Sequence, residues 1–197
     1  MELQTSKSDW HTRRARVILQ YRASQRKLDP EAITYLKNLF AVPNPPDHRL
    51  KALWSLHITK SLSENDLLKA LVDQDEYIRA WAIQLLCEDD GNKPAIITAL
   101  SRMAQSDTSA VVRLYLASVL QRLKPENRWA ILDGLVRHKI DNQDHNIPKM
   151  IWFGLEPLAA AEPEKAMSLA LKSNLTLPIN YIARRILDAG KLETLLH

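Results

Sequence analysis

The sequence predicts an all-α fold, a right-handed α-solenoid of about five helical hairpins that together form an α/α superhelix. Three observations lead to this prediction. One helical segment recurs along the chain, helix-start signals separate its copies, and signals for β-strands are weak, with only 4 glycines in 197 residues and no sustained alternation of apolar and polar residues. A recurring unit of this length is typical of stacked helical repeats.

The repeat is clearest in residues 71–86 and 103–120. Each copy places an aspartate six residues before an arginine, as Asp73 before Arg79 and Asp107 before Arg113. An aliphatic residue directly precedes each arginine, and an apolar helical pattern follows it. Weaker copies have their reference position, equivalent to the arginine, at Thr12, Arg49, Pro148 and Tyr181, so that the copies are 30 to 37 residues apart.

An apolar stripe runs along the helix that contains each reference position. Offsets −1, +3, +6 and +7 from that position fall on one side of a helix. In the two clearest copies they are Ile78, Ala82, Leu85 and Leu86, and then Val112, Leu116, Val119 and Leu120. The first copy has His11, Ala15, Ile18 and Leu19 there. The stripe predicts inner helices at residues 9–23, 46–60, 76–88, 109–122, 146–159 and 179–188.

Helix-start signals lie between these segments. Pro30, Pro125 and Pro163 each precede an acidic residue. Proline suits the first helical position, where its missing N–H is not needed, and an acid there suits the helix dipole. Ser63 and Asp66 have the spacing of a capping box. These signals predict outer helices at residues 30–41, 63–72, 94–105, 125–138 and 163–173.

The run from Val72 to Arg79 resembles the turn and second helix of a HEAT repeat. The resemblance implies that the aspartate stabilises the turn and that the arginine reaches the aspartate of a neighbouring repeat through charge-assisted hydrogen bonds. We therefore expect Asp73, Arg79, Asp107 and Arg113 to be structural residues between repeats, with no catalytic role.

A closer resemblance covers most of the chain. Residues 10–20, 75–89, 112–122 and 144–157 are similar to the helical segment of large membrane-bound dehydrogenases of planctomycetes, verrucomicrobia and related bacteria. In that family a β-propeller precedes the HEAT segment and a c-type cytochrome module follows it. This chain has no Cys-x-x-Cys-His motif for haem and no propeller strands. The resemblance thus implies an excised, non-enzymatic scaffold or interaction segment with no cofactor.

Length and composition predict one domain, residues 1–197. Its 46% hydrophobic and 25% charged residues are ordinary for a globular protein. We expect no membrane-spanning helix, because no apolar stretch is long enough, and no signal peptide, because residues 1–7 lack an apolar core. We expect a cytoplasmic protein if the chain is complete, and a periplasmic or secreted one if it is part of the dehydrogenase.

The net charge of +4 raises nucleic acid as a partner. HEAT-like solenoids with a basic concave face include DNA glycosylases that recognise alkylated bases, so this resemblance implies an alternative function, a HEAT-like DNA-binding protein of the alkylpurine DNA glycosylase type. The basic residues of this chain, however, are concentrated near the N-terminus and are mixed with acidic residues elsewhere. That distribution favours a solvated surface or the end of a solenoid over a phosphate-binding track. The N-terminal cluster consists of Arg13, Arg14, Arg16, Arg22, Arg26 and Lys27.

Catalytic and metal-binding patterns are weak. Cys87 precedes three acidic residues, which disfavour a thiolate. Asp141, Asp144 and His145 lie close together but lack a defined ligand spacing, and Asp144 is equally suited to cap the helix near Pro148. We expect no catalytic residue and no metal site.

Apolar residues also occupy the side of the inner helices opposite the stripe, at offsets +1, +4, +5 and +8 from the reference position. A solenoid can bury both sides, or this side can form an aromatic groove for a partner. The groove interpretation predicts binding of a neighbouring domain of the parent protein or of another protein, with weak self-association of the isolated chain. Its predicted residues are Trp54, His57, Trp81, Tyr115, Trp152 and Phe153.

Overall fold

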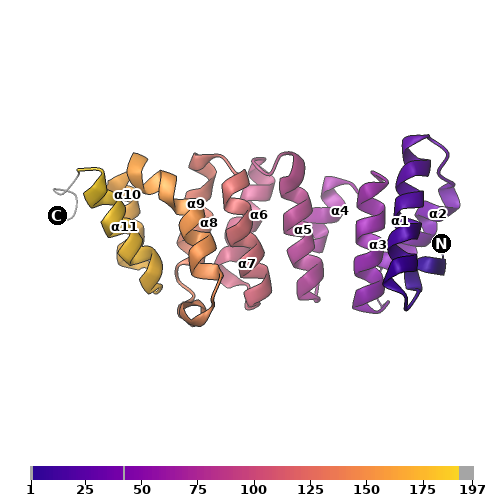
Figure 1. The fold of residues 1–197 in the computed structure, drawn as a ribbon, viewed down its shortest axis with the longest axis horizontal. Coiled ribbons are helices and arrows are strands. Elements are labelled where there is room, and N and C mark those ends of the chain that lie inside the picture. Colours follow the sequence, from indigo (N-terminus) through magenta and orange to yellow (C-terminus); the bar gives the residue numbers. More distant parts are fainter. Residues whose placement is uncertain (1, 42, 191–197) are drawn as a thin grey trace. The chain divides into compact units, whose positions relative to one another are not determined.

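The computed structural model describes residues 2–41 and 43–190. These residues form eleven α-helices and three short 3-10 helices, with no β-strand among them (Figure 1). The all-α prediction is confirmed. The predicted domain of residues 1–197 also includes Met1, Val42 and residues 191–197, which lie outside the described part. The structure divides into two compact units, up to Ala82 and from Ile83 onward, and each is described by itself.

The first unit contains four complete helices and the beginning of a fifth. Helix α1 packs on α3 and on the short helix η1, and α2 packs on α3. Leu19, Leu36 and Leu56 from the first three helices form a buried cluster, against which Phe40 and Leu62 also pack. The elements are η1 (Glu2–Thr5), α1 (Asp9–Ser24), α2 (Pro30–Phe40), α3 (Pro46–Ile58), α4 (Glu64–Ala70) and α5 (Glu76–Asp89), which runs into the second unit.

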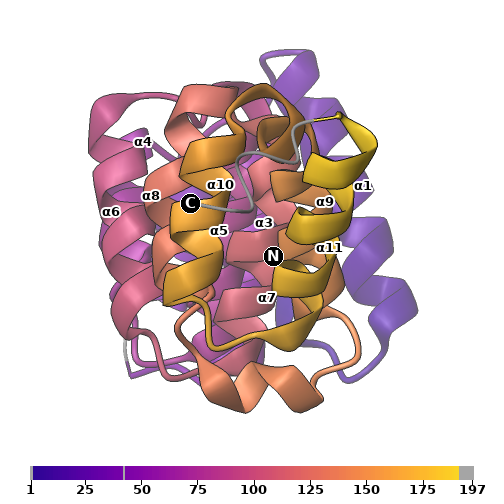
Figure 2. The same ribbon diagram turned by 90° about the vertical axis from the view of Figure 1, so that its left-hand side faces the viewer.

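The second unit is built in two layers (Figure 2). Helix α6 packs on α8 in one layer, and α7, α9 and α11 pack successively in the other. Helix α10 contacts α9 and α11. The elements are α6 (Pro94–Ser106), α7 (Ala110–Val119), η2 (Leu120–Arg122), α8 (Pro125–Leu135), η3 (Lys139–Gln143), α9 (Ile147–Ala161), α10 (Pro163–Lys172) and α11 (Thr176–Asp188).

Local signals account for most helix starts. Proline occupies the first turn of α2, α3, α6, α8 and α10. Ser63 and Asp66 form the predicted capping box at the start of α4. Asp144 Oδ1 accepts hydrogen bonds from the amides of Asn146 and Ile147, 2.8 Å each, at the start of α9. Because these caps satisfy amides that have no partner inside the helix, they fix where each helix begins.

The predicted apolar stripe is buried in most copies. The residues at the first position of the stripe, offset −1, are fully buried in three copies: Ile78, Val112 and Ile147. The first and last copies differ. In the first, only Leu19 of the stripe is buried, while His11 and Ile18 are exposed. The prediction for Ile18 is therefore wrong: α1 places Thr12 and Leu19 toward the unit, and Ile18 lies outside that line. In the last, the stripe positions Asn180, Arg184 and Leu187 are exposed, and α11 buries Pro178, Ile182 and Ile186 instead.

Candidate functional site

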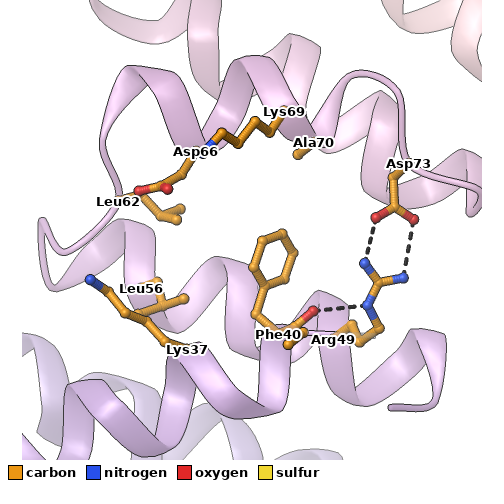
Figure 3. A pocket seen from close by; sticks show the side chains of 10 residues that line it. Lys37, Phe40, Arg49, Leu56, Leu62, Asp66, Lys69, Ala70 and Asp73 are labelled. Carbon is orange, nitrogen blue, oxygen red and sulfur yellow. Dashed lines mark hydrogen bonds and ion pairs between the residues drawn. The ribbon is translucent and has the colours of Figure 1, made fainter. Parts of the chain in front are cut away.

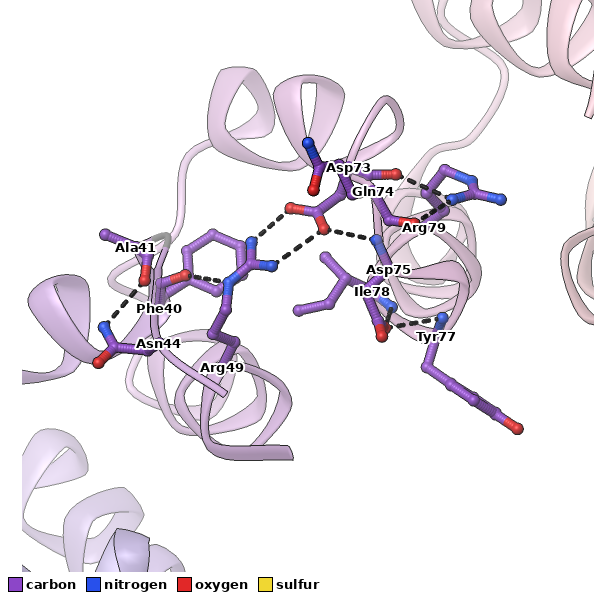
Figure 4. A network of polar contacts seen from close by, with 10 residues as sticks. All are labelled: Phe40, Ala41, Asn44, Arg49, Asp73, Gln74, Asp75, Tyr77, Ile78 and Arg79. Atoms are coloured by element: carbon purple, nitrogen blue, oxygen red, sulfur yellow. Dashed lines mark hydrogen bonds and ion pairs between the residues drawn. The ribbon is translucent and has the colours of Figure 1, made fainter. Parts of the chain in front are cut away.

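In the first unit, Arg49 and Asp73 connect two turns (Figure 4). Arg49 Nε donates to the Phe40 carbonyl oxygen at 2.8 Å, and both terminal nitrogens of its guanidinium donate to the Asp73 carboxylate. Asp73 Oδ1 also accepts from the Asp75 amide at 2.9 Å. The Asp73 side chain thus stabilises its own turn and also holds Arg49 of α3. Bidentate bonding of this kind matches both the charge and the planar shape of the two groups.

Arg79 binds the turn that precedes it. Its Nη1 donates to the carbonyl oxygens of Asp73, at 2.9 Å, and Gln74, at 3.1 Å (Figure 4). The six-residue spacing of the sequence repeat therefore has a structural reason, because it brings the guanidinium to the backbone of the aspartate itself.

The same geometry recurs independently in the second unit. Arg113 Nη1 donates to the Asp107 carbonyl oxygen at 3.0 Å, and Asp107 Oδ1 accepts from the Ser109 amide at 2.9 Å. Arg113 also makes two hydrogen bonds of 2.6 Å to the carboxylate of Asp141. Asp141 precedes the reference position Pro148 by seven residues instead of six, because the short helix η3 lies there.

Burial and hydrogen bonding act in opposite directions on Asp73. Burial raises the pKa of its carboxyl group, but hydrogen bonds from Arg49 and the Asp75 amide, with the charges of Arg49 and Arg79, outweigh it. The pKa of Asp73 therefore lies below its usual value, and the carboxylate is charged near neutral pH.

A pocket of about 370 Å³ lies beside this network in the first unit (Figure 3). The Phe40 ring points into it, and Leu56 and Leu62 add apolar surface. Two carboxylates line it, and both already have partners: Asp66 accepts from the Ser63 amide and hydroxyl, and Asp73 from Arg49. The pocket therefore offers apolar surface and cations, with its acids engaged in structural contacts.

Two predicted groove residues meet in the first unit. The rings of Trp54 and Trp81 pack edge to face, with centroids 5.0 Å apart, and the Arg16 guanidinium lies 4.8 Å from the Trp54 ring centre. All three side chains are half-buried. Trp54 Nε1 and Arg16 Nε are buried donors without a hydrogen-bond acceptor among the described residues. Burial, and then the charge of Arg13, lower the pKa of Arg16.

Arg16 was not predicted to belong to this cluster. It lies at offset +4 in the first copy, one of the offsets that predicted the groove face in the other copies. Applying the same rule to the degenerate first copy would have found it. His57, another predicted groove residue, lies on α3 with Trp54 and is half-buried.

The second unit contains another aromatic pair. Trp152 packs edge to face on Tyr181, with centroids 5.3 Å apart, and joins α9 to α11. Phe153 is exposed, whereas Trp152 and Tyr115 are half-buried. Tyr181 was not among the predicted groove residues. Offsets +4 of the next copies, Leu53, Ile83 and Ala117, are fully buried. This side of the helices is therefore closed at these three positions, whereas Trp54, Trp81, Tyr115 and Trp152 are half-buried and Phe153 is exposed.

The remaining candidates for chemistry have structural surroundings. Cys87 is buried, and burial raises its pKa to about 11 against the opposing charge of Arg122. Asp141 is engaged by Arg113, and Asp144 by backbone amides. Within the described residues, no group of three or more histidine, cysteine or acidic side chains is placed to hold a metal ion.

No protein-family model matches the chain, and comparison with curated proteins finds no significant match. Among the described residues, no helix is both long and apolar enough to cross a membrane.

Proposed function

We propose that the chain is a HEAT-like, right-handed α-solenoid that acts as a non-catalytic scaffold and binds a protein partner. The proposal includes the resemblance to the helical segment of membrane-bound dehydrogenases, whose neighbouring domains are the first candidates for the partner. The repeated turn geometry supports the solenoid. In each unit an arginine binds the backbone of the aspartate six residues earlier, which is expected of a structural repeat.

The observation that carries the binding function is the pair of unsatisfied donors on Arg16 and Trp54. A buried donor without an acceptor costs about 1–3 kcal/mol. Here two such donors lie in one half-buried cluster beside Trp81. Tryptophan and arginine are the residue types most enriched at the energetic centres of protein interfaces. A partner that places a carbonyl or carboxylate oxygen there would satisfy the donors and cover the rings.

The glycosylase alternative requires an available acid beside a pocket with a basic rim. The pocket of the first unit has Lys37 and Lys69 at its edge, but its acids Asp66 and Asp73 are held by structural hydrogen bonds. An acid engaged in this way is poorly placed to act as a general base. This favours the scaffold over the enzyme.

An anionic aromatic probe tests the Arg16–Trp54–Trp81 cluster directly. Anilinonaphthalene sulfonate combines a ring system with acceptor oxygens, so we expect it to bind the native chain with increased fluorescence. Trp54→Ala and Arg16→Met should each weaken binding by roughly tenfold, which corresponds to about 1.4 kcal/mol. Leu171→Ala, at an exposed residue on α10, is the matched control. Equal binding by all four proteins would contradict the proposed surface.

Two further measurements test the class of protein. Small-angle scattering should give a radius of gyration clearly above the roughly 16 Å of a compact globule of this length. The purified chain should also show no Soret absorbance and no dehydrogenase activity. A compact globule would reject the solenoid, and retained haem would reject the non-catalytic assignment.

A further inference from the structure

The outer side of α1 carries an exposed apolar stripe. Trp10 is 68% exposed, Val17 54% and Tyr21 66%, and Ile18 beside them is 41% exposed. Residues 10, 14, 17 and 21 follow one side of a helix. With Leu3, this short segment holds five of the twelve large hydrophobic residues that are exposed in the described part of the chain. The remaining seven are spread along residues 72–187, so exposed apolar residues are densest in sequence on and just before α1 within the described residues.

The stripe is not part of the core of the first unit. Helix α1 contacts α3 and η1 through its other side, where Thr12 and Leu19 are buried and the Thr12 hydroxyl donates to the Leu3 carbonyl oxygen. Packing within the unit therefore leaves Trp10, Val17 and Tyr21 exposed. Apolar patches that persist on a folded surface usually mark binding sites.

Cations lie within the stripe itself. Arg13 and Arg14 lie between Trp10 and Val17, about one helical turn from each. Arg22 lies one turn after Ile18. All three are exposed, and none makes an ion pair or a side-chain hydrogen bond within residues 2–41 and 43–190. The single acid of α1 is Asp9, at its first position. Because opposite charges face each other across protein interfaces, a partner that covers these arginines is expected to present carboxylates to them.

We propose that the outer side of α1 is a docking surface for an amphipathic helix of a partner protein, with an apolar stripe flanked by glutamate or aspartate. The stripe from Trp10 to Tyr21 extends about 16 Å at 1.5 Å per residue, which matches three turns of a partner helix. Helix-on-helix packing covers the apolar residues, and acids on the partner pair with Arg13, Arg14 and Arg22.

Two other classes of partner fit less well. A membrane-surface helix keeps its centre apolar and its basic residues at the borders. Here Arg13 and Arg14 lie between Trp10 and Val17, so insertion of the stripe would drag guanidinium groups toward the acyl chains. Nucleic acid would use the arginines, but a phosphate backbone gives no apolar contact to Val17, Ile18 and Tyr21. A helical protein partner satisfies both kinds of residue.

The test is selection from a displayed library of 18-residue helices. Each has a fixed leucine and alanine stripe, and its flanking positions vary among Glu, Gln and Lys. The native chain should enrich Glu at the flanks, and selected peptides should lose roughly tenfold or more in affinity for Val17→Asp, a change of about 1.4 kcal/mol or more. Because all substituted residues are exposed, each variant should unfold with nearly the same free energy as the native chain.

A charge exchange provides the decisive arm. The Arg14→Glu/Arg22→Glu double variant should select Lys at the flanks instead of Glu. Leu171→Asp, an 83% exposed residue on α10, is the matched control and should select the same peptides as the native chain. Failure to enrich any helix, or equal enrichment of Glu and Lys, would overturn the proposal.

Two direct probes distinguish the other partners. Phosphatidylglycerol vesicles and a 20-base-pair DNA duplex are each titrated with native chain and with Val17→Asp. Val17-dependent binding of either probe, without any selected helix, would replace the proposal by a membrane or nucleic-acid surface. The stripe lies apart from Trp54 and Trp81, and Arg16 is not altered, so this proposal and the proposed binding cluster can fail independently.

Discussion

Arg113 and Asp141 form a bidentate ion pair from which water is almost completely excluded. Arg113 Nε and Nη2 lie 2.6 Å from the two carboxylate oxygens, and the side chains are 3% and 2% exposed. The third guanidinium nitrogen donates to the Asp107 carbonyl oxygen. The pair thus joins the turn before α7 to the short helix before α9, and its loss would leave a charge buried without a partner.

Asp141→Ala should therefore destabilise the second unit strongly. Removing one member of a buried ion pair costs about 3–5 kcal/mol, because the remaining charge stays desolvated. Denaturant unfolding measures the change. The matched control is Asp133→Ala, which removes two solvent-accessible ion pairs, with Arg137 at 2.9 Å and with Lys172 at 3.6 Å, and is expected to cost at most about 1 kcal/mol for each pair. Similar small losses for both variants would show that the buried pair does not stabilise the unit.

The sequence alone located the helices well, because their boundaries depend on local chemistry. Pro30, Pro125 and Pro163 begin helices where predicted, and Ser63 caps α4. The differences occur where no local signal exists. Helix α11 starts at Thr176 instead of residue 179, and the 3-10 helix at Lys139–Gln143 was not predicted.

The candidate sites were predictable only in part. The repeat identified Arg79 and Arg113, but not Asp141, since η3 moves that carboxylate away from the expected spacing. The offsets placed Trp54 on the correct side of its helix, whereas its contact with Arg16 depends on how α1 packs against α3. A contact of this kind depends on the distance between two helices, which cannot be predicted from the residue pattern of either helix alone.

The ionisation of Asp73 should make stability depend on pH. Its pKa is depressed in the folded chain, so its contribution is fully present above the unfolded carboxyl pKa of about 3.9 and is lost as the pH falls through the folded value. Native chain and Asp73→Asn are compared by denaturant unfolding between pH 7 and pH 3. The difference in unfolding free energy should stay constant near neutral pH and shrink below about pH 4.

Arg49→Leu provides the control for this pH dependence. Without the guanidinium, burial of Asp73 is opposed by fewer favourable contacts, so the effect of Asp73→Asn in the Arg49→Leu background should vary much less with pH. The same pH profile with and without Arg49 would mean that the ion pair is not its cause.

Cys87 should be inert in the folded chain. Its thiol is buried and its pKa is about 11, so only roughly 0.1% is thiolate at pH 8, and reagents reach it poorly. Because it is the single cysteine of the sequence, an Ellman assay reads it directly. We expect slow reaction in buffer and rapid, stoichiometric reaction in guanidinium chloride. Rapid reaction of the native chain would reopen the question of a nucleophilic role.

Gly134 should resist replacement even by alanine, because α8 packs closely on the backbone of α6 there. An added Cβ would lie 2.7 Å from the Ala104 carbonyl carbon and 2.8 Å from the Gln105 nitrogen, and neither atom can rotate away. Alanine gains up to about 1 kcal/mol of helix propensity over glycine, whereas overpacking costs about 1–3 kcal/mol. We therefore expect Gly134→Ala to lower the unfolding free energy by about 1 kcal/mol or more. Ala130→Ser, on the exposed side of the same helix, should stay within about 0.5 kcal/mol. A stabilised Gly134→Ala protein would show that α6 and α8 are farther apart than the close contact requires.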